Sequence, residues 1–393
     1  MLTSIRLRNL KALYDTKECH VGKMTLLTGI NGRGKSSFLQ SLLLISQSMR
    51  KNGGSPKILD PMGDWCNLGK FEDLINTNAN GPVTIEYTTD TKTEKTFVFQ
   101  YQKPEDSDLY GEAISIKIDN DETVSFDAGT PDNTTGNSDA DIVGVPNAKP
   151  ETEEHLNSRS TYEDIAFLTS LQNLYFVSAD RYSAQDSEML LKTTRDKYLG
   201  EHGQFVLNVL SQCTQEQRDN LEMAMREILD GASLIIDVDK RTDRVYLYLG
   251  SQCDGEVYKP INVGYGYSYI ISTLLSAILV PINGILIIEN PEAHLHPQAQ
   301  ARLMKYLIHL SKEKNVQCFI ETHSDHIVNG LLVSLKENEI AVEDASILFF
   351  DRKTQDYKYS IDVTNLEITQ SGRVRRPPKG FCDQYGIDLR KLI

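Results

Sequence analysis

The stretch "TGINGRGKSSFLQ", residues 28–40, constrains the fold of this chain more than any other part of it. Residues 29–36 match the pattern G-x-x-x-x-G-K-[ST] in full. The pattern follows "KMTLLTG", which is typical of a β-strand, and precedes residues 36–50, whose apolar positions repeat at helical spacing. A strand, a glycine loop and a helix in this order predict a phosphate-binding loop at the start of an α/β fold.

The residue types in this loop fit phosphate chemistry. Glycines let successive backbone N–H groups point into one concavity, and the following helix adds its positive N-terminal dipole. Lys35 is expected to reach the β- and γ-phosphates, and the Ser36 hydroxyl is expected to ligate Mg²⁺. The residues predicted to bind the nucleotide at this loop are Gly29, Asn31, Gly32, Arg33, Gly34, Lys35, Ser36 and Ser37.

A second informative segment lies about 250 residues downstream of the glycine loop. There the apolar run "ILII" ends in an acid, Glu289. A strand buried on both faces can present such a carboxylate at the carboxyl edge of a parallel sheet. We therefore expect Glu289 to hold Mg²⁺ beside the phosphates, directly or through water.

Histidines follow both downstream strands. His323 comes after "VQCFIE" and could donate a hydrogen bond to a γ-phosphate or to the attacking water, whereas a lone histidine is otherwise a surface or capping residue. His294 and His296, with Glu292, could form a metal site. The favoured interpretation is a turn that shapes the loop, because Pro297 follows at once and no third ligand is evident.

Two glycines precede an apolar helix in "NVGYGYSYIIS", residues 262–272. Gly264 and Gly266 fit either a simple turn or a second anion-binding helix start. The three tyrosines of this stretch are expected to be packing residues; they are Tyr265, Tyr267 and Tyr269.

Periodicity divides the rest of the chain. Runs alternating at period two between 82 and 128 predict a small antiparallel sheet, and 129–158 reads as an acidic, mobile loop. Residues 160–235 read as mainly helical apart from the strand "NLYFVSAD", and "RVYLYLG" reads as another strand.

An α/β pattern follows, with predicted helices at 267–280, 297–314 and 324–337 and predicted strands at 284–289, 316–321 and 346–350. Four segments result: 1–80, 81–158, 159–258 and 259–393.

Charge and cysteine content narrow the classes of function. A formal net charge of −14 argues against a general nucleic-acid binder. The charge is uneven, however: residues 1–53 carry nine Lys or Arg and two acids, so a local anion-binding face is possible. Six cysteines without a C-x-x-C pair fit reduced thiols in the cytoplasm. No 18-residue apolar run is present, so no membrane span is expected.

The order of these motifs resembles a known group. The start "IRLRNLKAL…GKMTLLTGINGRGKSSFLQSLLL", with "ILIIENPEAHLHPQAQ" and "CFIETHSDHIVNGL", resembles the ABC-type ATPases of the RecF, SMC and OLD group. "WCNLGKFEDL", "YFVSADRYSAQ" and "GRVRRPPKGFCDQYGIDL" resemble bacterial AAA-like ATPases with a DUF3696 C-terminal segment. The resemblance covers residues 1–78, 173–200 and 259–393.

That resemblance implies a P-loop fold of the ABC-ATPase head type, with a central, mostly parallel sheet, an antiparallel sheet and a helical insertion. It implies ATP and Mg²⁺ as cofactors, Glu289 as the Walker B acid and His323 as the histidine switch. Gly264 and Gly266 take the signature-loop position, which caps ATP held by a second subunit. Asn290 stands where such enzymes usually place their catalytic glutamate. An amide cannot accept a proton as a carboxylate can, so either Glu292 is the base or hydrolysis is slow and binding is the working event.

We therefore expect an ATP-binding, ATP-hydrolysing module that forms a homodimer or higher homo-oligomer. By resemblance it would control a separate effector, a nuclease or toxin, within an antiphage system. Two alternatives remain open: a RecF-like DNA clamp, and a nucleotide-sensing scaffold with little turnover. No heptad array is present, which argues against a long coiled-coil arm.

Overall fold

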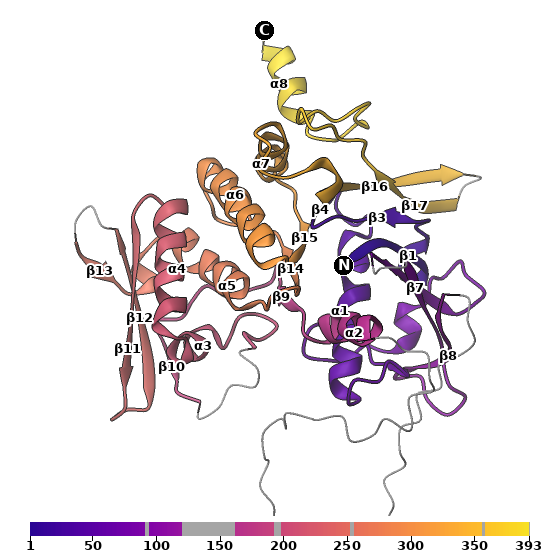
Figure 1. Cartoon of the computed structure of the whole chain (residues 1–393), viewed down its shortest axis with the longest axis horizontal. Coiled ribbons are helices and arrows are strands. Elements are labelled where there is room, and N and C mark those ends of the chain that lie inside the picture. The colour runs from indigo at the N-terminus through magenta and orange to yellow at the C-terminus, as the bar shows by residue number, and fades with distance from the viewer. Residues whose placement is uncertain (91–93, 120–161, 192–197, 252–254, 356–357, 393) are drawn as a thin grey trace, which may run out of the picture.

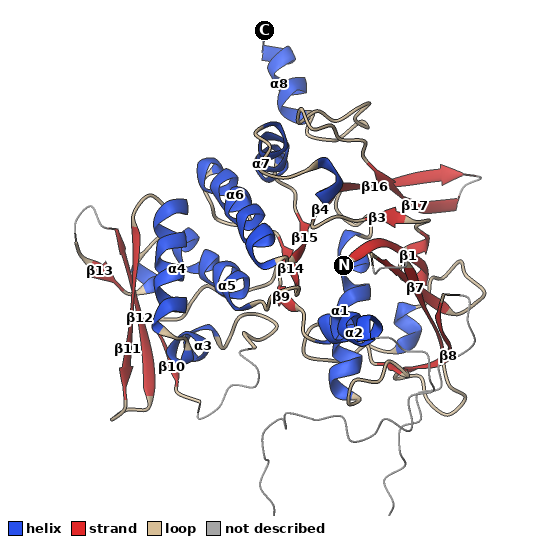
Figure 2. Ribbon diagram, in the orientation of Figure 1, coloured by secondary structure: helices blue, strands red, loops and turns tan. Residues whose placement is uncertain are grey.

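The computed structural model describes residues 1–90, 94–119, 162–191, 198–251, 255–355 and 358–392. Within them, the strands form three sheets with helices packed between (Figures 1 and 2). The predicted acidic loop at 129–158 lies outside the described residues. None of the described helices is both long and apolar enough to cross a bilayer.

The central sheet is the α/β sheet that the sequence predicts. Its strands, in spatial order, are β17 (Lys358–Asn365), β16 (Ala345–Gln355), β4 (Met24–Gly29), β15 (Gln317–Glu321), β14 (Ile285–Glu289) and β9 (Tyr175–Val177). The five strands from β16 to β9 run parallel, and only β17 is antiparallel. The expected α/β class with a mostly parallel sheet is therefore confirmed.

Helices cover both faces of this sheet because side chains alternate along each strand. Ile287 and Phe319 face a core that includes helix α1, whereas Ile288 and Ile320 face a second core under the C-terminal helices. Figure 1 shows α1 and α2 on one side and α5 and α6 on the other. The helices are α1 (Lys35–Lys51), α2 (Tyr162–Gln172), α5 (Tyr265–Leu279), α6 (Pro297–Lys314) and α7 (Asp325–Lys336).

The antiparallel strands predicted between 82 and 128 belong to a larger sheet that begins at the N-terminus. Its path is β2 (Leu13–Asp15), β1 (Leu2–Leu10), β6 (Val83–Thr89), β7 (Lys95–Gln102), β8 (Gly111–Ile118) and β5 (Ile58–Leu59), with β3 (Cys19–His20) beside β1. Since β1 pairs with β6, residues on both sides of position 80 form one sheet.

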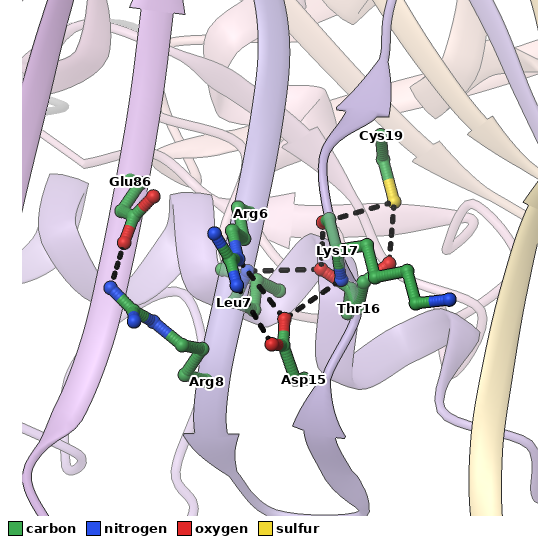
Figure 3. Close-up of polar contacts among 8 residues, drawn as sticks. All are labelled: Arg6, Leu7, Arg8, Asp15, Thr16, Lys17, Cys19 and Glu86. Atoms are coloured by element: carbon green, nitrogen blue, oxygen red, sulfur yellow. Dashed lines mark hydrogen bonds and ion pairs between the residues drawn. The ribbon is translucent and has the colours of Figure 1, made fainter.

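Polar contacts tie β1 to its neighbours β2 and β6 (Figure 3). Arg6 Nη2 lies 2.8 Å from Asp15 Oδ2, and the Leu7 N–H donates to Thr16 Oγ1 at 3.0 Å. Arg8 pairs with Glu86 on β6. The contacts of Arg6 and Leu7 hold β2 in register beside β1, which places Leu13 on β2 next to the glycine loop.

The segment expected to be mainly helical carries more strand than the sequence indicates. After α2 and β9 it contains helices α3 (Val206–Gln212) and α4 (Gln215–Ile228). A separate sheet is formed by β10 (Ser187–Met189), β12 (Arg244–Ser251), β11 (Ala232–Asp239) and β13 (Val257–Tyr258). β10 and β11 are absent from the sequence-based expectation, because each is stabilised by pairing with β12 rather than by a strong local pattern.

The C-terminal region ends in a hairpin and a helix. β16 extends beyond the predicted 346–350 because it pairs with β17 along most of its length. Helix α8 (Gln384–Leu392) follows and projects from the body of the molecule (Figure 1). It contains no buried residue.

Candidate functional site

The glycine loop joins β4 to α1 in the conformation that a phosphate cradle requires. Gly29 has φ 131°, and a Cβ there would lie 2.2 Å from the carbonyl oxygen of Phe350 on β16. Gly34 is the N-cap of α1 with φ 85°, and a Cβ there would lie 2.8 Å from the Leu13 side chain. Both positions therefore require glycine. The first turn of α1 carries no acid, so its N-terminal dipole is available to an anion.

Lys35 is held over this loop. Its side chain is buried, and Nζ donates to the backbone carbonyls of Gly29 and Ile30, each at 3.1 Å. Burial lowers the pKa of Lys35, and the nearby Glu321 charge opposes that shift. Within the described residues Lys35 forms no ion pair at salt-bridge distance, so its charge remains available to phosphate.

The remaining loop residues differ in exposure. Asn31 and Gly32 are exposed, and Ser37 is buried in α1. Arg33 is half-buried, and its Nε has no hydrogen-bond partner in the described part of the chain. This orphaned donor beside the loop is consistent with an anionic ligand.

The hydroxyl of Ser36 faces an acid that the sequence analysis missed. Ser36 Oγ donates to Glu321 Oε2 at 2.9 Å. Glu321 is 6% exposed and ends β15, which lies directly between β4 and β14. Burial raises its pKa, while the hydrogen bond from Ser36 and the charge of Lys35 oppose the rise. A signal was present in the sequence, because "VQCFIE" ends in an acid just as "ILIIE" does.

Glu289 ends the next strand, β14, and pairs in register with Glu321. Its Oε2 accepts the Ala179 N–H at 3.0 Å. Burial raises the pKa of Glu289 to about 7, and the neighbouring Glu321 charge adds to the rise. Glu289 is thus one strand farther from the P-loop strand than Glu321, and Ser36 makes its hydrogen bond to the nearer of the two acids.

A buried arginine holds the backbone that follows Glu289. Arg181 is 3% exposed, and its Nη1 donates to the Ser178 and Glu289 carbonyls at 2.9 and 3.0 Å. Its Nη2 donates to the Asn290 carbonyl at 3.0 Å, and its guanidinium lies over the Tyr269 ring. Burial lowers the pKa of Arg181 to about 10. The sequence stretch "SADR" contains this residue, but no local pattern indicates its role.

Asn290 contributes backbone rather than acid chemistry. It adopts φ 44°, which asparagine tolerates better than most residues. Its N–H donates to the Glu321 carbonyl at 2.9 Å, and its Oδ1 is buried without a partner among the described residues. The side chain therefore lies in the site without supplying a carboxylate.

Glu292 is engaged with the end of β15. Its Oε2 accepts the Thr322 hydroxyl at 2.9 Å, and its Oε1 accepts the His323 N–H at 2.8 Å. His323 as a residue is exposed to solvent, but its ring is partly buried. This burial is the main cause that lowers the pKa of His323, and the positive charge of Lys35 lowers it further. The structure thus places Lys35, Glu289 and His323 at one sheet edge, with Glu321 between them.

The second glycine pair lies where α5 begins. Gly264 is the N-cap of α5, and a Cβ at Gly266 would lie 2.6 Å from the His294 carbonyl oxygen, so the α5 start packs closely on the loop after β14. The His294 ring lies 4.5 Å from the Tyr269 ring. Tyr265, expected to be a packing residue, is instead 65% exposed, because it lies at the open end of the helix. His296 caps α6 through Nδ1, as a turn residue would.

The donor set at this edge suits a divalent cation beside polyphosphate. Ser36, Glu289 and Glu321 offer only oxygen atoms, which Mg²⁺ prefers. Backbone N–H groups and Lys35 would face the phosphates, while the acids lie on the side of β15 and β14. The residues present therefore fit a nucleotide with Mg²⁺.

Comparisons with known proteins agree with this geometry. The family described as AAA ATPase domain matches residues 1–328, and a protein family of unknown function, DUF3696, matches residues 340–392. The uncharacterized protein MJECL11 of Methanocaldococcus jannaschii is 29% identical over 129 residues, which is 33% of this chain and 99% of that protein.

Heads of SMC proteins are among the solved structures that match this chain. The SMC head bound to the C-winged helix domain of ScpA matches with a TM-score of 0.52 and 13% identity, covering 93% of this chain and 98% of that one. The SMC head domain from Thermotoga maritima matches with a TM-score of 0.47 and 11% identity, covering 93% and 99%. The first of these likenesses shows that the chain has the fold of an SMC head.

Proposed function

Because the chain belongs to the AAA ATPase domain family, we propose that it is a Mg²⁺-dependent module that binds and hydrolyses ATP. In this proposal two copies assemble around their nucleotides and control a separate effector in the cytoplasm. The effector, the antiphage role and the oligomer go beyond what the family shows, and separate features of the molecule support each.

The observation that carries the proposal is the composition of one sheet edge. Lys35 and Ser36 lie in the loop and helix that follow β4. Glu321 ends β15 and His323 lies two residues after it, while Glu289 ends the adjacent β14. A cationic cradle and a row of acids on neighbouring parallel strands form the arrangement that phosphoryl transfer uses for positioning and charge stabilisation.

Each residue has a role that its position supports. Backbone N–H groups of the loop and Lys35 would bind the phosphates, and Ser36 with Glu289 would hold the cation. Bound Mg²⁺ supplies charge neutralisation of the phosphoryl oxygens. His323 is exposed at the same edge and can donate a hydrogen bond toward the γ-phosphate. Glu292 remains the candidate base among the residues that follow β14.

Assembly of two copies is supported by the exposed start of α5. Gly264 is exposed and Tyr265 is 65% exposed, and Ile261 just before them is 79% exposed. An apolar, glycine-containing helix start that is open to solvent suits a surface completed by another subunit. We therefore assign Gly264 and Gly266 to the face that would cap ATP held by a second copy.

A separate effector is supported by the C-terminal helix and by the resemblance to OLD-like and DUF3696-containing ATPases. On α8, Tyr385 is 75% exposed and Leu392 is 83% exposed, although both are apolar or aromatic. Such residues on a projecting helix (Figure 1) favour a protein partner. A nuclease or toxin is the effector class that the resemblance implies, with antiphage defence as the setting.

A specific observation favours each alternative function. Four exposed basic residues close to α8 favour a DNA clamp; they are Arg373, Arg375, Arg376 and Lys379. A clamp would bind DNA with an affinity that falls steeply as salt rises. Asn290 at the position of the usual base favours a nucleotide sensor with little turnover.

The proposed function is tested by titrating a fluorescent ATP analogue into the wild type and Lys35→Ala, with Mg²⁺ present. Loss of the buried cation should weaken binding by roughly 10- to 100-fold, because hydrogen bonds to charged groups contribute about 1.5–3 kcal/mol each. Lys51→Ala is the matched control, since Lys51 lies at the opposite end of α1 with its side chain 58% exposed. Equal affinity of Lys35→Ala and wild type would remove the proposal.

Light scattering with a non-hydrolysable ATP analogue tests the assembly. The wild type should double in mass or assemble further when the analogue and Mg²⁺ are added, and Gly264→Asp should bind the analogue but stay monomeric. A wild type that stays monomeric with saturating analogue would contradict the shared nucleotide site.

A further inference from the structure

The strand order places an acid between the two elements that the sequence singles out. β15 lies between the P-loop strand β4 and the strand of Glu289, so the residue that ends β15 is the first acid next to the loop. That residue is Glu321, which is 6% exposed and accepts the Ser36 hydroxyl at 2.9 Å. The two residues are 285 positions apart in the chain.

The other polar side chains at this sheet edge, those of Glu289, Glu292 and Asn290, form no hydrogen bond with the P-loop among the described residues. Glu289 accepts the Ala179 N–H on its far side, toward β9. Both oxygens of Glu292 accept hydrogen bonds from Thr322 and His323. Asn290 carries no charge. Among the acids of the described residues at this edge, Glu321 is therefore the one whose carboxylate contacts the P-loop.

The direction of the hydrogen bond matters for cation binding. A serine hydroxyl has one proton and two lone pairs. Because Ser36 donates its proton to Glu321, the lone pairs of Oγ stay free for a cation. The backbone holds the geometry from both sides, since Asn290 N–H donates to the Glu321 carbonyl at 2.9 Å and Thr322 N–H donates to the Leu27 carbonyl at 3.0 Å.

We propose that Glu321 is the positioning carboxylate of the divalent-cation subsite, acting through Ser36. It orients the Ser36 hydroxyl so that an oxygen lone pair faces the cation, and it adds a negative charge one strand nearer to the loop than Glu289. This inference rests on the proposed function, because the cation is the one that accompanies the bound nucleotide.

The test compares wild type with Glu321→Gln by titrating the fluorescent ATP analogue over a Mg²⁺ series and in EDTA. Glutamine has the same shape and can still accept the Ser36 hydroxyl, so the change removes charge with little change of packing. The Mg²⁺ concentration that gives half of the Mg²⁺-dependent gain in affinity should rise roughly 10- to 100-fold, as it does when a residue that orients a metal ligand is replaced. Binding in EDTA should stay close to wild type, which also reports that the variant is folded.

Two further variants sharpen the result. Glu339→Gln is the matched control, because Glu339 also accepts a serine hydroxyl, from Ser334 at 2.8 Å, at the opposite end of α7. It should leave the Mg²⁺ dependence unchanged. Ser36→Ala should raise the Mg²⁺ requirement as well, and Glu321→Gln should add little to it in the double variant, because both act through one contact.

The outcomes are distinct. If wild type binds the analogue with Mg²⁺ and Glu321→Gln has the same Mg²⁺ requirement, this inference is overturned while the proposed function stands. If Glu289→Gln alone raises the requirement, the subsite belongs to Glu289 and the inference is again overturned. If Glu321→Gln does not fold, Ser36→Ala takes its place in the test, and an unchanged Mg²⁺ requirement of that variant would overturn this inference. A wild type that binds no nucleotide overturns the proposed function, and this inference with it.

Discussion

Thr322 donates its hydroxyl to Glu292 at 2.9 Å, and this bond ties the loop after β14 to the end of β15. The neighbouring His323 N–H completes the attachment by donating to the other carboxylate oxygen at 2.8 Å. The residue that the sequence offers as a general base therefore also holds the backbone of His323 in place. The two roles make different predictions.

If Glu292 chiefly holds this backbone in place, Glu292→Gln should lower the free energy of unfolding by roughly 1–3 kcal/mol, because an amide nitrogen would face one of the two donors. Nucleotide binding should persist. Chemical denaturation of both proteins measures the change, with Glu313→Gln as a control, since Glu313 is exposed on α6. Unchanged stability with a hydrolysis rate about 100-fold lower or more would assign Glu292 as the base instead.

Arg181→Lys should destabilise the protein by roughly 2–3 kcal/mol. A lysine ammonium cannot reproduce the planar fork that serves the carbonyls of Ser178, Glu289 and Asn290, and buried carbonyls would lose their donors. Urea denaturation gives the difference. Arg241→Lys is the matched control, because the Arg241 side chain is 93% exposed. Equal losses in the two variants would show that the Arg181 contacts contribute nothing specific.

The raised pKa of Glu289 predicts a pH dependence of stability. Below its ordinary value of 4.5 the group is protonated in both folded and unfolded chains, and between 4.5 and about 7 only the unfolded chain releases the proton. The folded state therefore loses stability as pH rises through this window, by up to about 3 kcal/mol. Glu289→Gln should remove the loss.

This prediction is measured by denaturing wild type and Glu289→Gln at intervals from pH 4.5 to 8 without metal or nucleotide. The advantage of the variant should grow with pH up to about 7 and then level off. A difference that stays constant over the whole range would mean that Glu289 titrates near its ordinary pKa.

Asn290→Glu should raise hydrolysis by roughly tenfold or more, because it restores a carboxylate where the resemblance places the base and general bases contribute about 10²- to 10⁴-fold. Asn290→Gln is the matched control: it imposes the same strain at φ 44° but adds no acid. Single-turnover hydrolysis of the two variants beside wild type gives the comparison. Equal rates in the two variants would show that position 290 does not limit turnover.

The sequence by itself determined the local parts of this site. The P-loop follows from the spacing of Gly29, Gly34, Lys35 and Ser36, and α6 spans the 297–314 expected from its periodicity. The strands that end in Glu289 and Glu321 were evident as short apolar runs, and each is buried as expected. These features depend on neighbours within a few residues, so a single sequence can reveal them.

Only the tertiary structure decided which acid meets Ser36. An apolar run shows that a strand is buried but not which strands lie beside it, because strand order is set by packing between residues far apart in the chain. β15 lies between β4 and β14, so Glu321 rather than Glu289 receives the Ser36 hydroxyl. For the same reason the sequence did not reveal the role of Arg181, because most of its hydrogen bonds go to backbone carbonyls more than 80 residues away.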